Sequence, residues 1–117
     1  LTAVSVRHTK SFIEYDTGLA FEIPENHVGL LFPRSSISKK GLLLCNSVGV
    51  IDSSYRGPVK LRFTKTHTFD KLENALYDIG DRIGQLIIMP YPQIEFEEVE
   101  ELDETDRGNG GFGSSGN

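Results

Sequence analysis

The chain has 117 residues, 38% of them hydrophobic, which is the size of one domain with a modest core. It contains no apolar stretch of the length that a membrane-spanning helix needs and no visible secretory signal, so no membrane partner is expected. The net charge of −5 is unevenly distributed along the chain, because residues 95–106 hold eight of the 17 acids and no base. The mildly cationic remainder has no Lys/Arg stripe of the kind that is typical of nucleic-acid binding.

Strand patterns dominate the chain. Residues 59–64 show the clearest alternation and are expected to turn Val59, Leu61 and Phe63 inward. Residues 85–89 are nearly all apolar, which predicts a strand buried on both faces. Further strands are expected at residues 19–23, 28–32 and 94–97, and one or two helical turns at residues 71–76. Short strands separated by Gly, Pro and Asp turns predict an all-β sandwich or barrel.

The segment 33–41 follows a strand that ends at Pro33 and offers phosphate-binding groups. Arg34 supplies a guanidinium, and Ser35 and Ser36 supply hydroxyls. The spacing is not that of a P-loop. Gln85, within residues 80–87, precedes a strand and could reach a phosphate with its amide. The alternatives are surface turns and, for Asp81 and Arg82, a structural ion pair.

Cys45 is the single cysteine and cannot form an internal disulfide. It follows three leucines, which predicts a buried, unreactive thiol. A lone cysteine indicates a reducing compartment, and the expected location is the cytoplasm, with the nucleus or a host cytosol as alternatives.

Residues 46–57 contain an apolar run that ends at a carboxylate, a polar turn and a tyrosine. Asp52 directly follows Val50 and Ile51, and is expected to be partly desolvated, where a base is useful. Tyr55 could fold over whatever Asp52 contacts. The alternative is a plain β-turn, since Asp and Ser are common turn residues.

The C-terminal part divides into an acidic segment (residues 95–106), expected to be a strand end and linker, and a Gly-rich C-terminal arm (residues 107–117). The alternative for the arm is a disordered terminus. Its composition indicates more: Arg107, Ser114 and Ser115 could contact an anion, and Phe112 could stack on a base. Residues 1–94 are expected to form the core and the arm a mobile lid, all within one domain.

The chain resembles the trimeric dUTP pyrophosphatases (dUTPases) along nearly its whole length. Their five motifs occur in order, at Tyr15–Asp16, 33–36, 46–59, 80–87 and 107–116. The resemblance implies a distorted jelly roll, or β-clip barrel, that assembles into homotrimers with three active sites at subunit boundaries. It also implies hydrolysis of dUTP to dUMP and pyrophosphate, which limits uracil incorporation into DNA and supplies dUMP for dTMP synthesis.

The same resemblance implies a role for each motif residue. Asp52 would activate the water that attacks the α-phosphorus, while Mg²⁺ would be held mainly by the triphosphate and contacted by Asp16 through water. Tyr55 would pack on the deoxyribose and Phe112 on the uracil. The substrate-binding residues implied in this way are Arg34, Ser35, Ser36, Asn46, Val50, Ile51, Tyr55, Lys60, Gln85, Arg107, Phe112, Gly113, Ser114 and Ser115.

The chain departs from the family's usual motifs in four places. Glu14 precedes Tyr15–Asp16 where the family commonly has glycine, which weakens the metal role of Asp16. Ser36 replaces a common glycine, and Ser115 a usual threonine that also carries a hydroxyl. Pro58 follows Gly57 where Glu or Gln is frequent, and predicts a strand start or edge.

Two other functions stay open. A dCTP deaminase relative would share the fold and act on the cytosine ring. A nucleotide-sensing module would bind dUTP to control a protein partner without turnover. Asp52, Tyr55 and the complete fifth motif favour the hydrolase over both.

Overall fold

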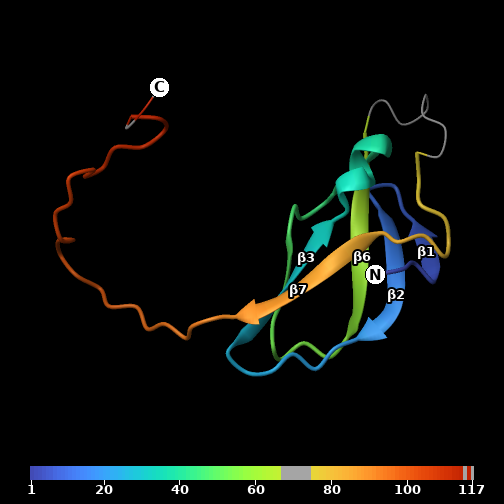
Figure 1. Cartoon of the computed structure of the whole chain (residues 1–117), viewed down its shortest axis with the longest axis horizontal. Helices are drawn as coiled ribbons and strands as arrows, with labels where there is room; N and C mark the ends of the chain where they lie inside the picture. The colour runs from blue at the N-terminus through green and yellow to red at the C-terminus, as the bar shows by residue number, and fades with distance from the viewer. Residues whose placement is uncertain (67–74, 115, 117) are drawn as a thin grey trace.

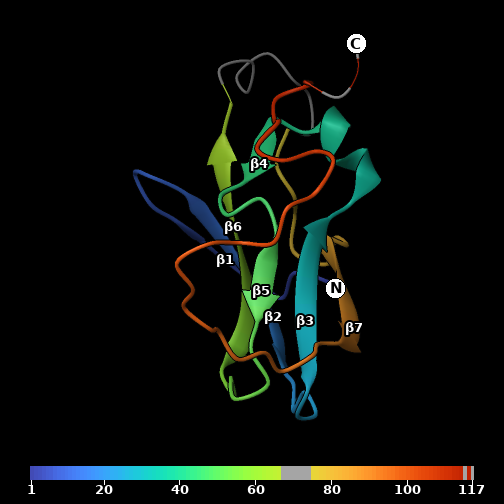
Figure 2. The same ribbon diagram turned by 90° about the vertical axis from the view of Figure 1, so that its left-hand side faces the viewer.

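The structure is a computed structural model that describes residues 1–66, 75–114 and 116. Its elements in chain order are β1 (Ser5–His8), β2 (Ile13–Ala20), β3 (His27–Pro33), the 3-10 helix η1 (Ser35–Lys39), β4 (Leu42–Leu44), β5 (Gly49–Ile51), β6 (Pro58–Lys65) and β7 (Gly84–Pro90). All strand pairs are antiparallel, in one sheet of order β1-β2-β6-β4 and another of order β5-β3-β7 (Figures 1 and 2). The all-β prediction is confirmed, and Pro58 begins β6 as expected.

The core contains the inward faces of β2 and β6. Val59, Leu61 and Phe63 are buried, as the alternation predicts. The rings of Tyr15, Phe63 and Tyr77 contact one another edge-on or tilted, with centroids 5.7–6.0 Å apart. The Tyr15 hydroxyl donates to the Tyr77 carbonyl oxygen at 2.9 Å, so the core also fixes the chain that leads into β7. Tyr15, part of the expected first motif, is therefore a core residue.

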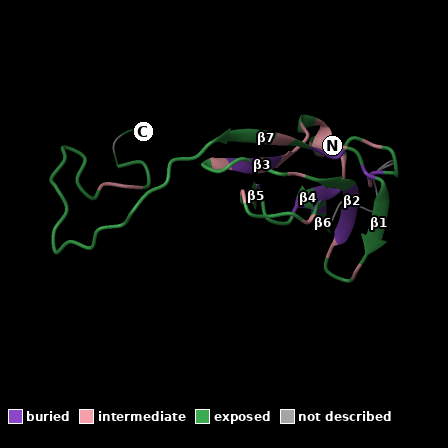
Figure 3. Cartoon of the chain, turned by 90° about the horizontal axis from the view of Figure 1, so that it is seen from below, coloured by how far each residue is buried: buried purple, intermediate pink, exposed green. Residues whose placement is uncertain are grey.

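The expectation that residues 85–89 are buried on both faces is wrong. β7 lies at the edge of its sheet and pairs only with β3. Ile87, Ile88 and Met89 are exposed, although successive residues point to opposite faces (Figure 3). An apolar run alone does not show whether a strand lies in the centre of a sheet or at an edge that another subunit could cover.

Cys45 is exposed, so the buried thiol was also a wrong expectation. β4 alternates, with Leu42 and Leu44 inward and Leu43 outward, and the next residue outward is Cys45. Its Sγ lies 3.1 Å from Oγ1 of Thr64 on β6.

The chain beyond β7 leads away from the two sheets (Figures 1 and 3). No strand occurs in residues 91–114, so the strand expected at 94–97 is not formed in this single chain. The radius of gyration is 19.0 Å, whereas a compact chain of this length has about 13 Å. The expected division at residues 94 and 106 stays a prediction.

Two further expectations concern helices. The turns expected at residues 71–76 fall mostly outside the described residues, and Ala75 and Leu76 are not helical. Among the described residues, no helix has the length and apolar character needed to cross a membrane.

Candidate functional site

Six of the predicted site residues line one cavity of about 320 Å³, between the turn after β5 and the outer side of β6. They are Asn46, Val50, Ile51, Asp52, Tyr55 and Lys60. β5 and β6 bring them together because a short polar turn joins the two strands. The Tyr55 backbone N–H donates to the Asp52 carbonyl oxygen at 3.1 Å and closes that turn.

Asp52 follows the last residue of β5 and is exposed. The expected partial desolvation is therefore not found in the single chain, because β5 has three residues and the turn projects into solvent. Asp52 also lines a second, larger cavity of about 650 Å³, with Val28, Leu30 and Met89 among its walls. No ion pair involves Asp52 within the described part of the chain.

Tyr55 folds back over its own turn. Its hydroxyl donates to the Pro58 carbonyl oxygen at 2.9 Å. The ring covers Gly57 so closely that a Cβ at that position would lie 2.5 Å from the Tyr55 hydroxyl oxygen. Gly57 thus gives the ring room to face the cavity.

The second and fourth motifs meet at another place. Arg34 precedes η1, and the Gln85 side-chain amide donates to the Pro33 carbonyl oxygen at 3.1 Å. Arg34, Ser35 and Gln85 line a cavity of about 420 Å³, whereas Ser36 does not. An Arg34 guanidinium nitrogen donates to the Arg82 carbonyl oxygen at 3.3 Å. The single chain does not join this cavity to the one that holds Asp52.

The arm residues lie far from both cavities in the single chain. Arg107 Nε donates to the Gly110 carbonyl oxygen at 2.8 Å, and the Phe112 ring is fully exposed. Gly113 has a positive φ of 87° and Ser114 donates its backbone N–H to Gly111, so the turn is local. Ser115 lies outside the described residues.

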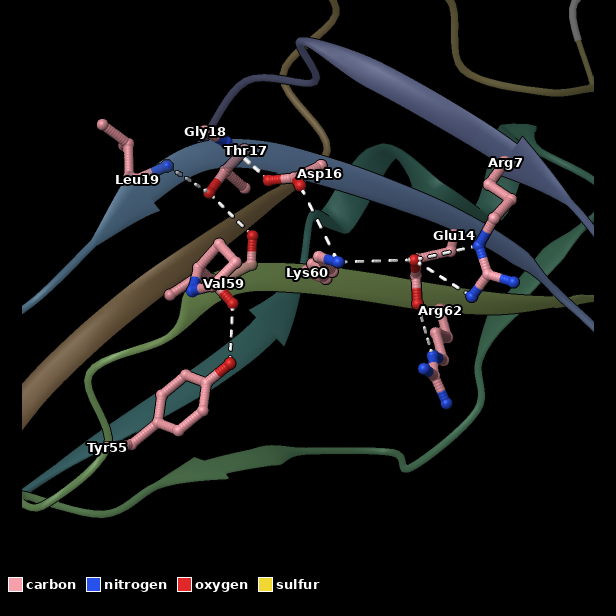
Figure 4. A network of polar contacts seen from close by, with 11 residues as sticks. Arg7, Glu14, Asp16, Thr17, Gly18, Leu19, Tyr55, Val59, Lys60 and Arg62 are labelled. Atoms are coloured by element: carbon pink, nitrogen blue, oxygen red, sulfur yellow. Dashed lines mark hydrogen bonds and ion pairs between the residues drawn. The ribbon is translucent and has the colours of Figure 1, made fainter.

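Asp16 lies where β2 departs from regular pairing with β6. Its Oδ1 accepts the Gly18 N–H at 2.8 Å, and its Oδ2 lies 3.9 Å from the Lys60 ammonium (Figure 4). Among the described residues, no group of three or more His, Cys, Asp or Glu could hold a metal ion. The donors present do not fit a protein-built magnesium site, and the metal role of Asp16 stays a prediction.

Sequence reasoning missed Glu14 and Arg62, which line the same cavity as Asp52. Glu14 Oε2 accepts a hydrogen bond from Arg62 Nε at 2.7 Å, and this bond holds the pKa of the Glu14 carboxyl below its ordinary value despite burial (Figure 4). The alternation of residues 59–64 placed Arg62 on the outer face of β6. No sequence signal showed that Glu14 is its cross-strand partner.

The dUTPase family model matches residues 2–116. A deoxyuridine 5'-triphosphate nucleotidohydrolase of Escherichia phage T5 is 46% identical over 103 residues, 86% of this chain and 66% of that protein. One of Finegoldia magna is 48% identical over 103 residues, 86% of this chain and 68% of that protein. The chain thus spans about two thirds of the length of these relatives.

Solved structures agree with these relatives. A Staphylococcus bacteriophage 80alpha dUTPase with dUPNHPP is 31% identical, with a TM-score of 0.77 over 96% of this chain and 80% of that one. A mutant dUTPase from phage phi11 of S. aureus, described with a structural Mg(II) ion, is 25% identical, with a TM-score of 0.68 over 86% of this chain and 81% of that one. The jelly-roll fold expected from the sequence is confirmed.

Proposed function

The chain belongs to the dUTPase family, and we propose that it hydrolyses dUTP to dUMP and pyrophosphate. The observation that carries this proposal is the convergence of Asn46, Asp52 and Tyr55 on one cavity, from a segment of 12 residues that the sequence alone singles out. The cavity, at about 320 Å³, is large enough for a pyrimidine nucleoside.

Asp52 is the proposed base. Its carboxylate is exposed at the end of β5 and carries no ion pair in the described part of the chain, so it can accept a proton from water. That water attacks the α-phosphorus in line with the departing pyrophosphate. Tyr55 packs on the deoxyribose and excludes a 2′-hydroxyl. The uracil edge is contacted by Asn46, by the backbone of β5 and by Lys60.

The triphosphate extends from this cavity toward cationic and hydroxyl donors. Arg34, Ser35, Ser36 and Gln85 hold its oxygens, and positioning with charge neutralisation provides most of the catalysis in phosphoryl transfer. From the C-terminal arm, Arg107, Gly113, Ser114 and Ser115 then close over the γ-phosphate, while Phe112 stacks on the uracil. Stacking contributes about 1–3 kcal/mol, which offsets the ordering of only one or two residues, so the phosphates must contribute as well.

A homotrimer completes the site in this proposal. The outer face of the β5-β3-β7 sheet carries an apolar strip formed by Val50, Leu30 and Ile87, which are cross-strand neighbours. Val50 is 65% exposed and Ile87 48%, and the cavity that Asp52 shares with Leu30 opens on this face. Packing a second subunit there buries the strip and desolvates Asp52. It also brings the separate phosphate-binding residues of a neighbour within reach.

Mg²⁺ enters this proposal as part of the substrate complex. Magnesium commonly binds through substrate phosphates and a few waters, so it needs no cage of protein ligands. Asp16 would contact it only through water. A cytoplasmic location, expected from the lone cysteine, also stays a prediction.

One assay separates the candidate functions. The protein is incubated with Mg²⁺ and either dUTP or dCTP, and pyrophosphate and ammonia are measured separately. Pyrophosphate from dUTP supports the proposal, and ammonia from dCTP supports the deaminase. Tight dUTP binding without either product supports a nucleotide sensor and contradicts the hydrolase.

A further inference from the structure

A cavity of about 260 Å³ lies beside η1 and the turn that precedes β7, and the proposed reaction gives it no role. We call it the basic cavity, because its wall contains three cationic side chains and one carboxylate. The residues that line it are Arg34, Lys40, Tyr77, Gly80, Asp81 and Arg82. Of these, Lys40, Tyr77 and Arg82 line none of the cavities that hold the proposed dUTP-binding residues.

Tyr77 brings an unpaired hydroxyl to this cavity. The residue is only 5% exposed, and its hydroxyl is the one buried side-chain nitrogen or oxygen in the described part of the chain that has no hydrogen-bond partner. The ring is fixed in the core by its contacts with Tyr15 and Phe63, so the hydroxyl cannot turn toward another acceptor. Buried polar groups are nearly always paired, and an unpaired one commonly marks a place where a water or an ion binds.

The surroundings of the Tyr77 hydroxyl make it a hydrogen-bond donor. Burial raises its pKa above the ordinary value of 10.0, so the hydroxyl keeps its proton at neutral pH. The charged groups that act on it are Arg34 and Asp81, and both line the basic cavity. Lys40 Nζ lies 5.0 Å from the centroid of the Tyr77 ring and donates to the Leu76 carbonyl oxygen at 3.0 Å. This bond holds a third cation beside the same ring.

The two guanidinium groups of the basic cavity are not neutralised by carboxylates. Neither Arg34 nor Arg82 forms an ion pair within the residues that the structure describes. The ion pair considered for Asp81 and Arg82 is therefore not formed, and Asp81 Oδ2 instead accepts the Asp78 backbone N–H at 2.8 Å. Arg34 bonds the Arg82 carbonyl oxygen through one guanidinium nitrogen, which leaves its other N–H groups for a ligand.

Such a wall suits a small anion with several oxygens. Guanidinium groups present paired N–H donors that match phosphate oxygens, and a hydroxyl adds a donor from another direction. The one carboxylate is engaged in a turn, so it opposes three cations with a bonded oxygen. Pockets for drug-sized ligands measure about 300–1,000 Å³, and this smaller cavity therefore fits an inorganic ion better than a whole nucleotide.

We propose that the basic cavity binds inorganic phosphate or pyrophosphate, with the Tyr77 hydroxyl and the Arg82 guanidinium as donors and with Lys40 and Arg34 as neighbouring positive charges. The two ions present the same kind of oxygen, and pyrophosphate is also the product of the proposed reaction. The site does not depend on that reaction, because its occupant is recognised by Tyr77, Lys40 and Arg82, to which dUTP hydrolysis assigns nothing.

The test is calorimetric titration of phosphate and of pyrophosphate at fixed ionic strength, with Tyr77→Phe compared with Tyr91→Phe. Tyr77→Phe keeps the core ring and removes only the unpaired hydroxyl, so it should fold. We expect its Kd for the bound ion to rise about tenfold, as for the loss of one hydrogen bond to a charged group. Tyr91 is exposed and lies outside the basic cavity, so Tyr91→Phe should match the wild type.

A second pair of variants removes one positive charge each. Arg82→Gln should raise the same Kd about tenfold, because it removes a charged donor of the cavity. Lys39→Gln, at an exposed residue that does not line the cavity, should leave the Kd unchanged. If Tyr77→Phe does not fold, this pair decides the question. The proposed substrate-binding residues are intact in all four variants, so any binding of the ions there contributes equally.

Each ion whose Kd depends on Tyr77 and Arg82 is thereby identified as an occupant of the cavity. A wild type that binds neither ion, or a folded Tyr77→Phe protein that binds both as tightly as the wild type, overturns the proposal. An equal loss of affinity in Arg82→Gln and Lys39→Gln also overturns it, because that result shows only a general effect of charge. A wild type that binds the ion in this way but releases no pyrophosphate from dUTP refutes the proposed function alone.

Discussion

At the scale of single residues, the Tyr55 ring lies so close over Gly57 that it leaves no room for a side chain there. A Cβ at position 57 would lie 2.7 Å from Cζ and 2.9 Å from Cε1 of the Tyr55 ring, so the ring must move if Gly57 becomes alanine. The ring is 45% exposed and can swing into solvent, which breaks its bond to Pro58 without opening the core.

We therefore expect Gly57→Ala to lower kcat/KM for dUTP about tenfold or more, with little change in Tm. The matched variant is Tyr55→Phe, which keeps the ring over Gly57 and loses only the hydroxyl, and its loss should be smaller. Steady-state kinetics and thermal unfolding measure both effects. Equal activity in Gly57→Ala and the wild type would show that the ring position does not matter.

Glu14 makes a pH-dependent contribution to stability. Its pKa is lowered from the ordinary value of 4.5, chiefly by the hydrogen bond from Arg62, so the folded protein favours the carboxylate. That stabilisation is fully present above pH 4.5 and is lost as the pH falls through the lowered pKa.

The difference in unfolding free energy between wild type and Glu14→Gln should accordingly be largest near neutral pH and shrink in acid. Urea unfolding of both proteins near pH 7 and again well below pH 4.5 measures it. A difference of the same size at both pH values would contradict the assigned role of the carboxylate.

At the residue scale, the sequence indicates which side chains lie together only where they belong to one short segment. Asn46, Asp52 and Tyr55 meet at one cavity because they flank a single turn, and the sequence shows that turn directly. Glu14 and Arg62 are 48 positions apart, and only the β2–β6 register brings them together. Whether Cys45 is buried depends on whether the alternation of β4 continues beyond Leu44. A run of three leucines does not show that alternation, because inward and outward positions carry the same residue.

At the scale of elements, β7 differs most from its sequence pattern. Its apolar residues are exposed because the strand lies at the edge of the sheet, and Ile87 continues the strip formed by Val50 and Leu30 across β3. Contiguous exposed apolar surface commonly marks an interface. The apolar sequence of β7, which predicted a buried strand, is therefore also consistent with an edge strand that a second subunit covers.

Ile87→Arg places a charge in this strip and should dissociate the proposed trimer, since an unpaired buried cation is costly. Leu43→Arg is the control, because Leu43 is 61% exposed on the other sheet and its change should leave assembly intact. Sedimentation velocity measures the molecular mass of each protein. A monomeric wild type, or a trimeric Ile87→Arg protein, would contradict the proposed interface.

The whole molecule consists of two packed sheets and a long segment that the sheets do not hold. Hydrogen bonds of residues 107–114 stay within or next to that segment, as between Gly108 and Thr105 or Arg107 and Gly110. Composition predicts such a separation, since glycine, serine and acidic residues offer no core face. Composition does not show on which surface the arm would close, because hydrogen bonds of the arm in the single chain are local.

Removal of all residues after Asp106 should therefore leave the fold intact and greatly reduce turnover. Circular dichroism and thermal unfolding should match the full chain within a few degrees, while kcat/KM for dUTP should fall by about tenfold to a hundredfold for the lost phosphate contacts and stacking. Unfolding of the truncated protein would contradict the separation of arm and core. Full activity would contradict the closing role of the arm.

Asp52 is the proton acceptor on which the proposed hydrolysis depends, and one measurement tests this role directly: pyrophosphate release from dUTP by Asp52→Asn, alongside binding of a non-hydrolysable dUTP analogue. We expect kcat to fall by about 100- to 10,000-fold, the usual contribution of a general base, with the Kd of the analogue nearly unchanged. Asp103→Asn, in the exposed acidic segment, should match the wild type. A kcat for Asp52→Asn close to that of the wild type would contradict the mechanism.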